Sequence, residues 1–421
     1  MLKYVALKTN KFKHMNGLNA QEYMDREARY GAHNYHPLPV VLERGEGVFV
    51  WDIEGKKYFD FLSAYSAVNQ GHCHPKIVKA LTDQAQKLAL TSRAFYNNVL
   101  GEWEQYMTNL FGYDKMLPMN SGAEADETAL KLIRKWAYKV KGVPKSEAKI
   151  IVCNGNFHGR TITIVSMSSD PDAYNDYGPY TPGFINIPYN DIKALENALE
   201  DTNVGGFLVE PIQAEAGVYV PEDGFLRKAF DLCKKHNVLF VADEVQTGLG
   251  RTGKMLACDH EDVRPDILIL GKAISGGMLP VSCVLADNEI MLTIMPGEHG
   301  STYGGNPIAA KVAIAAMEVI RDEKLAENAE RMGKIFRKKL KSIDSKLIEI
   351  VRGKGLLNAV VIKPVNGKSA WDVCLALKNN GLLAKPTHEH IIRFTPPLVI
   401  TEEQLNKAIE IIEKTFIEMG V

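Results

Sequence analysis

The stretch Val238–Gly277 constrains the fold more than any other part of this chain. It contains two short apolar runs, Val238–Ala242 and Ile267–Leu270, which are rich in branched residues and too short to be apolar helices. Such runs are typical of strands that are buried on both faces of a parallel sheet. Asp243 follows the first run and Lys272 follows the second. Because open parallel α/β sheets bind ligands outside the carboxyl ends of their strands, both residues are expected in one site.

A lysine beside an aspartate in such a site suits the chemistry of pyridoxal phosphate (PLP). Lys272 lies in LGKAISGG, between apolar residues and small ones. Desolvation there favours a neutral, nucleophilic amine that can form a Schiff base. A carboxylate such as Asp243 keeps a pyridine nitrogen protonated, which makes the ring an electron sink. On the residues alone, a surface lysine and a strand-end cap remain open as the alternative.

Strands and helices alternate through the middle of the chain. Strands are expected at 149–153, 162–166 and 207–209, and a helix at 224–236, before the two apolar runs. This alternation predicts an α/β fold with a large domain whose central sheet is mostly parallel and flanked by helices. After residue 320 the pattern predicts a smaller α+β domain. Its helices are expected at 326–343, 369–379 and 402–418, and its strands at 348–351, 356–362, 383–385 and 391–394.

The chain before the large domain predicts an arm and a hairpin. Residues 21–45 are typical of a short helix followed by an irregular segment, because 31–40 contains two prolines and no regular period. A hairpin is expected at 47–61, with its turn at Glu54 and Gly55. We therefore predict three parts: an N-terminal arm and hairpin at 1–66, a PLP-binding domain at 67–320, and a small domain at 321–421.

Composition excludes several classes of partner. The net charge is −1, with 50 Lys+Arg against 51 Asp+Glu, which argues against nucleic acid or an anionic membrane as a partner. No apolar run approaches the length of a membrane span. The N-terminus lacks the apolar core of a secretory signal and the Arg and Ser of a presequence. A cytoplasmic protein with reduced, mostly buried cysteines is therefore expected, with the mitochondrial matrix as the alternative.

Two motifs have tempting interpretations that the sequence does not favour. Residues 248–253 match G-x-G-x-x-G, which suggests a dinucleotide-dependent oxidoreductase. That motif should join a strand directly to a helix, whereas 243–247 intervene here and the following residues are a poor helix, so a loop is expected. His72, Cys73 and His74 look like metal ligands, but residues one apart point to opposite sides of an extended chain, and no second cluster has a suitable spacing, so an ordinary loop is expected. No metal site is expected.

Two further features can bind anions. Ser121 and Gly122 begin an amphipathic helix after an apolar segment, which favours either a phosphate seat at the helix N-terminus or only a capped helix. Arg160 and Arg393 each lie in otherwise uncharged surroundings. A guanidinium there can hold a substrate carboxylate through two hydrogen bonds, or form a structural salt bridge.

The longer motifs around these residues resemble one family. LGKAISGG and VADEVQTGLGRTG resemble the class-III, ω-amino-acid branch of the fold-type I PLP aminotransferases. Additional motifs, in order from about residue 31 to the C-terminus, narrow the resemblance to the ornithine aminotransferases. They are GAHNYHPLPV, FDFLSAYSAVNQGHCHP, LTSRAFYNNVLG, NFHGRT, VEPIQAEAGV, GEHGSTYGGNP, VRGKGLLNA and IIRFTPPL.

The resemblance implies how PLP is held. Lys272 carries the cofactor as a Schiff base and moves the proton in catalysis, while Asp243 pairs with the pyridine nitrogen. Gln246 is implied to hydrogen-bond the ring hydroxyl, and Phe157 to stack on the ring. The phosphate is implied to lie on the backbone N–H groups of two residues and to contact one residue of the neighbouring subunit, which makes the enzyme a homodimer. These phosphate residues are Gly122, Ala123 and, from the neighbour, Thr302.

The implied reaction has two halves. The δ-amino group of L-ornithine passes to the cofactor, leaving L-glutamate 5-semialdehyde, and 2-oxoglutarate then accepts it to give L-glutamate. The resemblance implies that Glu215 masks Arg393 while ornithine binds through Arg160 and Tyr35, and that Glu215 moves away for 2-oxoglutarate.

Substrate choice remains open within this family. Another ω-aminotransferase, of the acetylornithine or 4-aminobutyrate type, is the alternative; Tyr35 and Tyr65 favour ornithine. The chain departs from the family at Ala214, where glycine is usual, and a left-handed backbone there would strain alanine. His158 follows Phe157 at a position that varies in the family, and no role is assigned to it.

Overall fold

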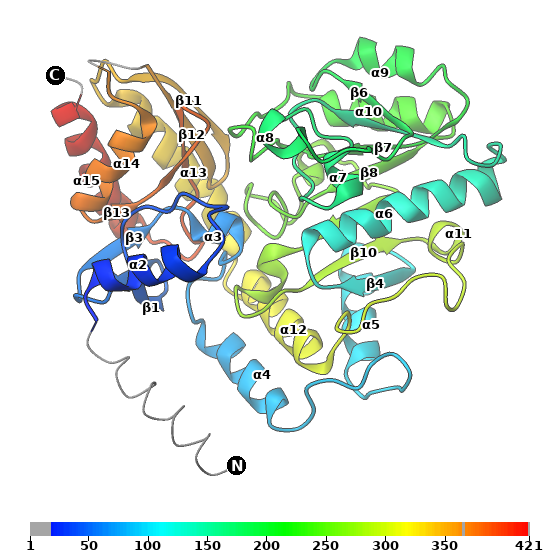
Figure 1. Ribbon diagram of the computed structural model, residues 1–421, viewed down its shortest axis with the longest axis horizontal. Coiled ribbons are helices and arrows are strands. Elements are labelled where there is room, and N and C mark those ends of the chain that lie inside the picture. The colour runs from blue at the N-terminus through cyan, green and yellow to red at the C-terminus, as the bar shows by residue number, and fades with distance from the viewer. Residues whose placement is uncertain (1–17, 364–366, 420–421) are drawn as a thin grey trace.

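A computed structural model describes residues 18–363 and 367–419 of the chain. Figure 1 shows the elements of the central sheet on one side and the C-terminal elements, in orange and red, on the other. The N-terminal strands lie against the C-terminal elements. The behaviour predicted for the first 17 residues lies outside the described ranges.

The central sheet has seven strands in the order β4-β10-β9-β8-β7-β5-β6. The five strands from β9 to β6 are parallel, whereas β10 runs antiparallel to both of its neighbours. The predicted α/β fold with a mostly parallel sheet is therefore confirmed. The strands are β4 Lys115–Met119, β5 Lys149–Cys153, β6 Phe184–Ile187, β7 Val204–Val209, β8 Leu239–Asp243, β9 Ile267–Leu270 and β10 Ser282–Ala286.

Helices cover both faces of this sheet, which explains why β8 and β9 are buried along their whole length. Val241 packs in a cluster with residues of α6, whereas its neighbour Phe240 packs in a cluster with residues of α9 and α10. Leu268 and Leu270 pack in a third cluster with residues of α4, α5 and α12. These helices are α4 Pro75–Ala85, α5 Leu100–Phe111, α6 Gly122–Trp136, α9 Ile192–Ala198, α10 Phe225–Lys235 and α12 Pro307–Asp322.

The strand predicted at 162–166 is wrong. Residues Ile162–Val165 form a single helical turn, α7, although they are rich in β-branched residues. The preceding strand, β5, already pairs with β6 on one side and β7 on the other, so no edge beside it is left for another strand. The other short elements are α3 Ser63–Ser66, α8 Pro171–Tyr174, α11 Asn288–Met291, a π-helical turn at Ala137–Lys141, and 3₁₀ turns at Cys258–Glu261 and Lys272–Ser275.

The C-terminal part forms an antiparallel sheet of order β11-β12-β15-β14, with helices packed on it. Lys324, whose backbone is left-handed, separates α12 from the first of these helices. The α+β pattern predicted for this region is confirmed. Its elements are α13 Leu325–Ser342, β11 Ile348–Lys354, β12 Leu357–Ile362, α14 Ala370–Asn379, β14 Lys385–Thr387, β15 Ile391–Phe394 and α15 Glu402–Met419.

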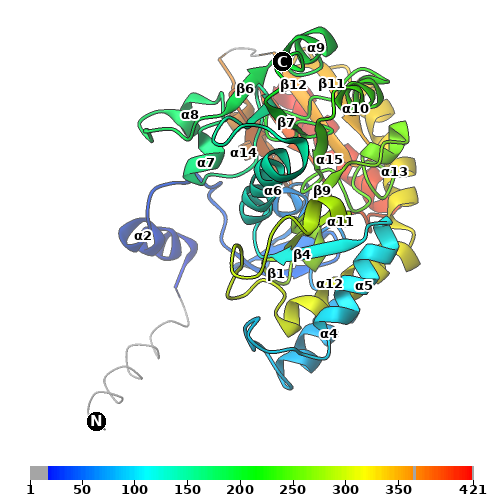
Figure 2. The same ribbon diagram turned by 90° about the vertical axis from the view of Figure 1, so that its right-hand side faces the viewer.

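The N-terminal strands share a sheet with a C-terminal strand. The predicted hairpin forms as β2 Phe49–Asp52 and β3 Lys57–Asp60, preceded by β1 Leu42–Glu46. The strand β13, Leu382–Leu383, pairs in parallel with β3. Hydrogen bonds therefore join the predicted arm to the small domain. The helix α2, Ala20–Tyr30, has no buried residue and stands apart from the rest of the chain (Figure 2).

The loop at 248–253 is structural, as its context predicted. It consists of turns and does not join a strand to a helix. Its Arg251 is fully buried, and its guanidinium donates to the carbonyl oxygens of Leu356 and Pro396 at 3.1 and 2.6 Å. It also donates to Asn69 Oδ1 at 2.6 Å. One side chain thus joins the loop after β8 to two segments of the small domain.

The cysteines agree with the prediction of reduced, mostly buried thiols. All six cysteines are free, and five of them are buried. Among the described helices, none is long and apolar enough to cross a membrane.

Arg251→Gln should destabilise the protein by about 2–4 kcal/mol, because buried carbonyl acceptors lose charged donors. Urea unfolding of the purified protein measures this change. Arg331→Gln is the matched control, because Arg331 forms an exposed ion pair with Glu402 and its loss should change the stability by less than about 0.5 kcal/mol. Equal effects of the two substitutions would contradict the structural role of Arg251.

Candidate active site

A cavity of about 150 Å³ lies at the carboxyl ends of the central strands. Six of the seven residues predicted to hold PLP line it, whereas Thr302 is exposed and lies outside this lining. The sequence therefore predicted which distant segments meet here. The residues that line the cavity are Gly122, Ala123, Asp126, Phe157, His158, Gly159, Glu210, Ile212, Asp243, Val245, Gln246, Thr247 and Lys272.

Lys272 follows β9 and has an unusual backbone conformation. Its φ angle is 45°, in the left-handed region that residues with a side chain rarely adopt. Burial lowers the pKa of its amine, while the carboxylates of Glu215 and Asp243 oppose that change. Burial in the cavity therefore makes the neutral, nucleophilic form of this lysine easier to reach than it is in water.

Asp243 ends β8 with its carboxylate almost fully buried. Its Oδ1 accepts a hydrogen bond from the Val245 N–H at 2.9 Å, and its Oδ2 lies 2.7 Å from Nδ1 of His158. Hydrogen bonds to a carboxylate favour its charged form. This arrangement suits the pairing of Asp243 with a cationic ring nitrogen.

The N-terminus of α6 forms one wall of the cavity. Ser121 and Glu124 form a reciprocal capping box, in which each side chain accepts from the other residue's N–H. Among the described residues, no side chain accepts from the N–H groups of Gly122 and Ala123, which remain free for an anion. Gly159, with φ 125°, lies so close that an added Cβ would be 2.6 Å from Cβ of Ala123.

These residues fit PLP by their chemistry. Lys272 supplies the amine, Asp243 the partner for the ring nitrogen, and the α6 N-terminus a seat for the phosphate. Phe157 lines the same cavity beside Lys272, and its N–H donates to Glu210 Oε2 at 3.1 Å.

A second, larger cavity of about 910 Å³ shares Phe157 and Lys272 with the first. Four of the five residues predicted to bind substrate line it: Tyr35, Tyr65, Arg160 and Glu215. Arg160 is exposed and has no ion-pair partner within the described ranges. Its free guanidinium can receive a carboxylate that enters the cavity.

Arg393, the fifth predicted residue, lies behind Glu215. Its Nη1 is 2.9 Å from Glu215 Oε1, while its buried Nε and Nη2 have no hydrogen-bond partner in the described structure. Burial alone would raise the pKa of Glu215, but the charges of Arg393 and Lys272 hold that pKa below its ordinary value. Glu215 is therefore ionised at neutral pH and covers part of a guanidinium that can still donate.

Gln246 connects the two cavities. Its side-chain N–H donates to Glu215 Oε1 at 3.0 Å, and its Oε1 accepts from Arg393 Nη1 at 3.5 Å. It also lines the PLP cavity, where its contact with the ring hydroxyl stays a prediction. The sequence did not indicate that the Gln246 amide contacts both Glu215 and Arg393.

Tyr65 is held in a strained turn. The four residues Ser63–Ser66 all have left-handed φ angles, between 46° and 71°. The Tyr65 hydroxyl accepts a hydrogen bond from Lys385 Nζ at 3.2 Å, and the Arg393 guanidinium lies 5.0 Å from the centre of its ring. The ring is thus fixed between two cations.

Several site residues were missed from the sequence. His158 and Asp126 line the PLP cavity, and Lys385 lines the larger one. The position of His158 beside Phe157 in NFHGRT was the one available signal. Ala214 is buried without a positive φ, so it does not carry the strain considered for it; that conformation occurs at Gly217 and Val218.

The chain matches the family Aminotransferase class-III over residues 30–416. It is 62% identical to the mitochondrial ornithine aminotransferase of Rattus norvegicus over 402 residues, which is 95% of this chain and 92% of that protein. A crystal structure of Toxoplasma gondii ornithine aminotransferase, which reports partial PLP occupancy, has a TM-score of 0.96 at 48% identity, covering 98% of this chain and 97% of that one. A structure named acetylornithine aminotransferase, from Elizabethkingia anophelis, has a TM-score of 0.88 at 62% identity, covering 96% and 100%.

A match over nearly the whole described chain, together with the amine, the carboxylate and the helix terminus in one cavity, establishes the family. This chain belongs to the class-III aminotransferases.

Proposed function

We propose that this enzyme transfers the δ-amino group of L-ornithine to 2-oxoglutarate, with PLP as cofactor, giving L-glutamate 5-semialdehyde and L-glutamate. The observation that carries the proposal is the Glu215–Arg393 pair, whose Glu215 lines the larger cavity together with Lys272. A site for these two substrates must accept a terminal amine in one half-reaction and an α-keto acid with two carboxylates in the other. A guanidinium that can be covered and uncovered meets both needs.

When bound, PLP supplies an electron sink for the carbon that carries the transferred amino group. The backbone N–H groups of Gly122 and Ala123 would hold its phosphate, Asp243 would hold its ring nitrogen, and Phe157 would contact the ring. Lys272 Nζ would hold the cofactor covalently and would carry the proton to and from the substrate carbon.

In the first half-reaction, Arg160 and Tyr35 bind the α-carboxylate end of ornithine at the outer part of the larger cavity. Glu215 meanwhile neutralises Arg393, so the inner part of the site does not attract that carboxylate. The terminal amine is therefore the end of the substrate that reaches Lys272. Tyr65, whose hydroxyl is hydrogen-bonded by Lys385, forms the wall between the outer part and the inner part of the site.

In the second half-reaction, both arginines hold carboxylates of 2-oxoglutarate. Glu215 moves away from Arg393, whose unpartnered Nε and Nη2 can then form a two-bonded contact. The α-keto group is placed beside Lys272, because the α-carboxylate now lies on Arg393. The second carboxylate remains on Arg160.

The enzyme is proposed to act as a homodimer in the cytoplasm, with the mitochondrial matrix as the alternative. Thr302 and Tyr303 are exposed on the loop before α12, which supports a contact of Thr302 with the phosphate of the neighbouring subunit. The rat relative is named mitochondrial, which keeps the alternative compartment open. The domain boundaries after residues 66 and 320 also stay predictions.

Borohydride reduction of the holoenzyme should leave a phosphopyridoxyl group on the peptide that contains Lys272. Lys272→Ala should remove this label and lower transamination by at least about 10²–10⁴-fold, because both the amine and the proton carrier are lost. Mass spectrometry of the digested protein and a transamination assay measure the two effects. A label on any other lysine would contradict the assignment.

An amino-donor panel with 2-oxoglutarate tests the substrate. Ornithine should exceed both N-acetylornithine and 4-aminobutyrate in kcat/KM by at least about tenfold; the acetylated donor is the second candidate because of the Elizabethkingia anophelis structure. Tyr65→Ile should shift the ratio toward 4-aminobutyrate by roughly tenfold, since it replaces a polar wall with an apolar one. If the wild-type enzyme prefers N-acetylornithine, ornithine is not the substrate. If Tyr65→Ile leaves the ratio of kcat/KM for ornithine to that for 4-aminobutyrate unchanged, Tyr65 does not set the substrate preference.

Glu215→Ala should increase the reaction with L-glutamate relative to L-ornithine by about tenfold or more, because Arg393 becomes permanently available to an α-carboxylate. The rates of the two half-reactions, followed by cofactor absorbance, measure this ratio. Glu222→Ala is the control, because Glu222 lies in a neighbouring exposed loop and lines neither cavity. If Glu215→Ala changes both half-reactions equally, the covering role is excluded.

A further inference from the structure

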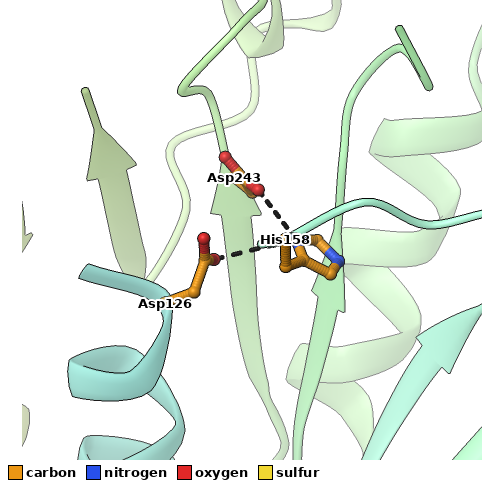
Figure 3. A group of neighbouring side chains, drawn as sticks. All are labelled: Asp126, His158 and Asp243. Atoms are coloured by element: carbon orange, nitrogen blue, oxygen red, sulfur yellow. Dashed lines mark hydrogen bonds and ion pairs between the residues drawn. The ribbon is translucent and has the colours of Figure 1, made fainter. Parts of the chain in front are cut away.

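Three buried ionisable side chains meet in the wall of the PLP cavity. Asp126, from α6, and Asp243, from the end of β8, both point toward His158 on the loop after β5 (Figure 3). One ligand-type atom from each residue lies within 4.8 Å of those of the other two. Their side chains are 1%, 5% and 0% exposed, respectively. We call these residues the buried triad.

The two carboxylates of the triad have different surroundings. Asp243 accepts hydrogen bonds on both oxygens, from the Val245 N–H and from His158 Nδ1. Asp126 Oδ1 lies 3.7 Å from the same nitrogen, too far for a hydrogen bond, and has no partner among the described residues. A buried carboxylate oxygen without a hydrogen-bond donor cannot readily hold a negative charge, and this condition applies to Asp126 Oδ1.

The charges that face Asp126 favour its neutral form. Burial raises the pKa of Asp126 well above its ordinary value, and the carboxylates of Asp243 and Glu210 raise it further. Lys272 acts in the opposite direction, and Glu127, on the same helix, adds to the increase. Like charges this close in a buried site cannot all ionise, so one acid takes up a proton.

We propose that Asp126 is an uncharged carboxylic acid and that His158 is a positioning residue for Asp243, so that the triad presents one carboxylate to the ring nitrogen of the cofactor. This inference rests on the proposed PLP site and extends it by two residues. If Asp126 were ionised, it would compete with Asp243 for the His158 N–H and for the positive ring nitrogen.

Asp126→Asn tests the charge of the first residue, because asparagine has the shape and charge of a protonated aspartate. The infrared spectrum of the wild-type holoenzyme at pH 7 should contain a carbonyl-stretch band of a protonated carboxyl that the variant lacks. The dissociation constant of PLP and the pH midpoint of the cofactor absorption band should stay within about threefold and half a unit of wild type. Identical infrared spectra, or a midpoint shifted by more than one unit, would show that Asp126 is charged.

A pair of substitutions tests His158. The amide nitrogen of asparagine can replace the donor at Nδ1, whereas that of glutamine replaces Nε2. His158→Asn should keep the PLP dissociation constant within about threefold of wild type, while His158→Gln should weaken binding tenfold or more. The ¹⁵N resonance of labelled cofactor should report a protonated ring nitrogen in wild type and His158→Asn, and a loss of protonation in His158→Gln.

The outcomes separate this inference from the function on which it rests. Equal losses in both histidine variants, with thermal unfolding temperatures lowered alike, would mean that His158 only fills space. If the wild-type protein binds no PLP, the proposed function itself is contradicted. A wild type that binds PLP but does not react with ornithine would change the substrate and leave the triad intact, because none of these measurements uses an amino donor.

Discussion

The ion pair between Glu215 and Arg393 requires the small domain to dock accurately on the large one. Arg393 comes from β15 in the small domain and Glu215 from the loop after β7 in the large one, so the ion pair forms only if the two parts dock accurately. Arg251 supplies part of that accuracy from the core, through hydrogen bonds to both parts. Removing either partner of a buried charge pair leaves an uncompensated charge, which is strongly unfavourable. The docking of the small domain and the charge balance of the site are therefore one constraint.

Backbone strain gathers around the same region. Lys272 and the turn Ser63–Ser66 adopt left-handed conformations that cost free energy for residues with side chains. Closely packed residues surround these segments. A Cβ added to Gly276, just after Lys272, would lie 2.5 Å from Ile77, and a Cβ added to Gly277 would lie 2.3 Å from Val68. The surrounding core holds these segments in place and thereby fixes the backbone that carries the Lys272 amine and the Tyr65 ring.

The sequence predicted the parts of the fold and site that depend on local pattern. Short apolar runs located β8 and β9, and the residues at their ends located the cavity. Residues 162–166 were mistaken for a strand because β-branched composition was visible but the occupied edges of β5 were not. The contact of His158 with Asp243 was missed for a similar reason, since the two side chains lie 2.7 Å apart in space but on different elements. The left-handed backbone conformation of Tyr65 could not be predicted either, because the residue types around it do not indicate it.

The residues of the PLP cavity all come from the segment between α6 and the turn after β9, whereas Tyr35 and Arg393 come from opposite ends of the chain. The residues of the PLP cavity thus lie in one segment of the sequence, whereas the residues predicted to bind substrate lie partly in that segment, as Arg160 and Glu215 do, and partly outside it. We therefore expect substitutions in the arm or in β15 to alter which amine is accepted while the residues of the PLP cavity stay unchanged. A fold organised in this way can diversify. The residues of the PLP cavity can be inherited unchanged while substitutions in the arm and in β15 adapt the enzyme to different amino donors.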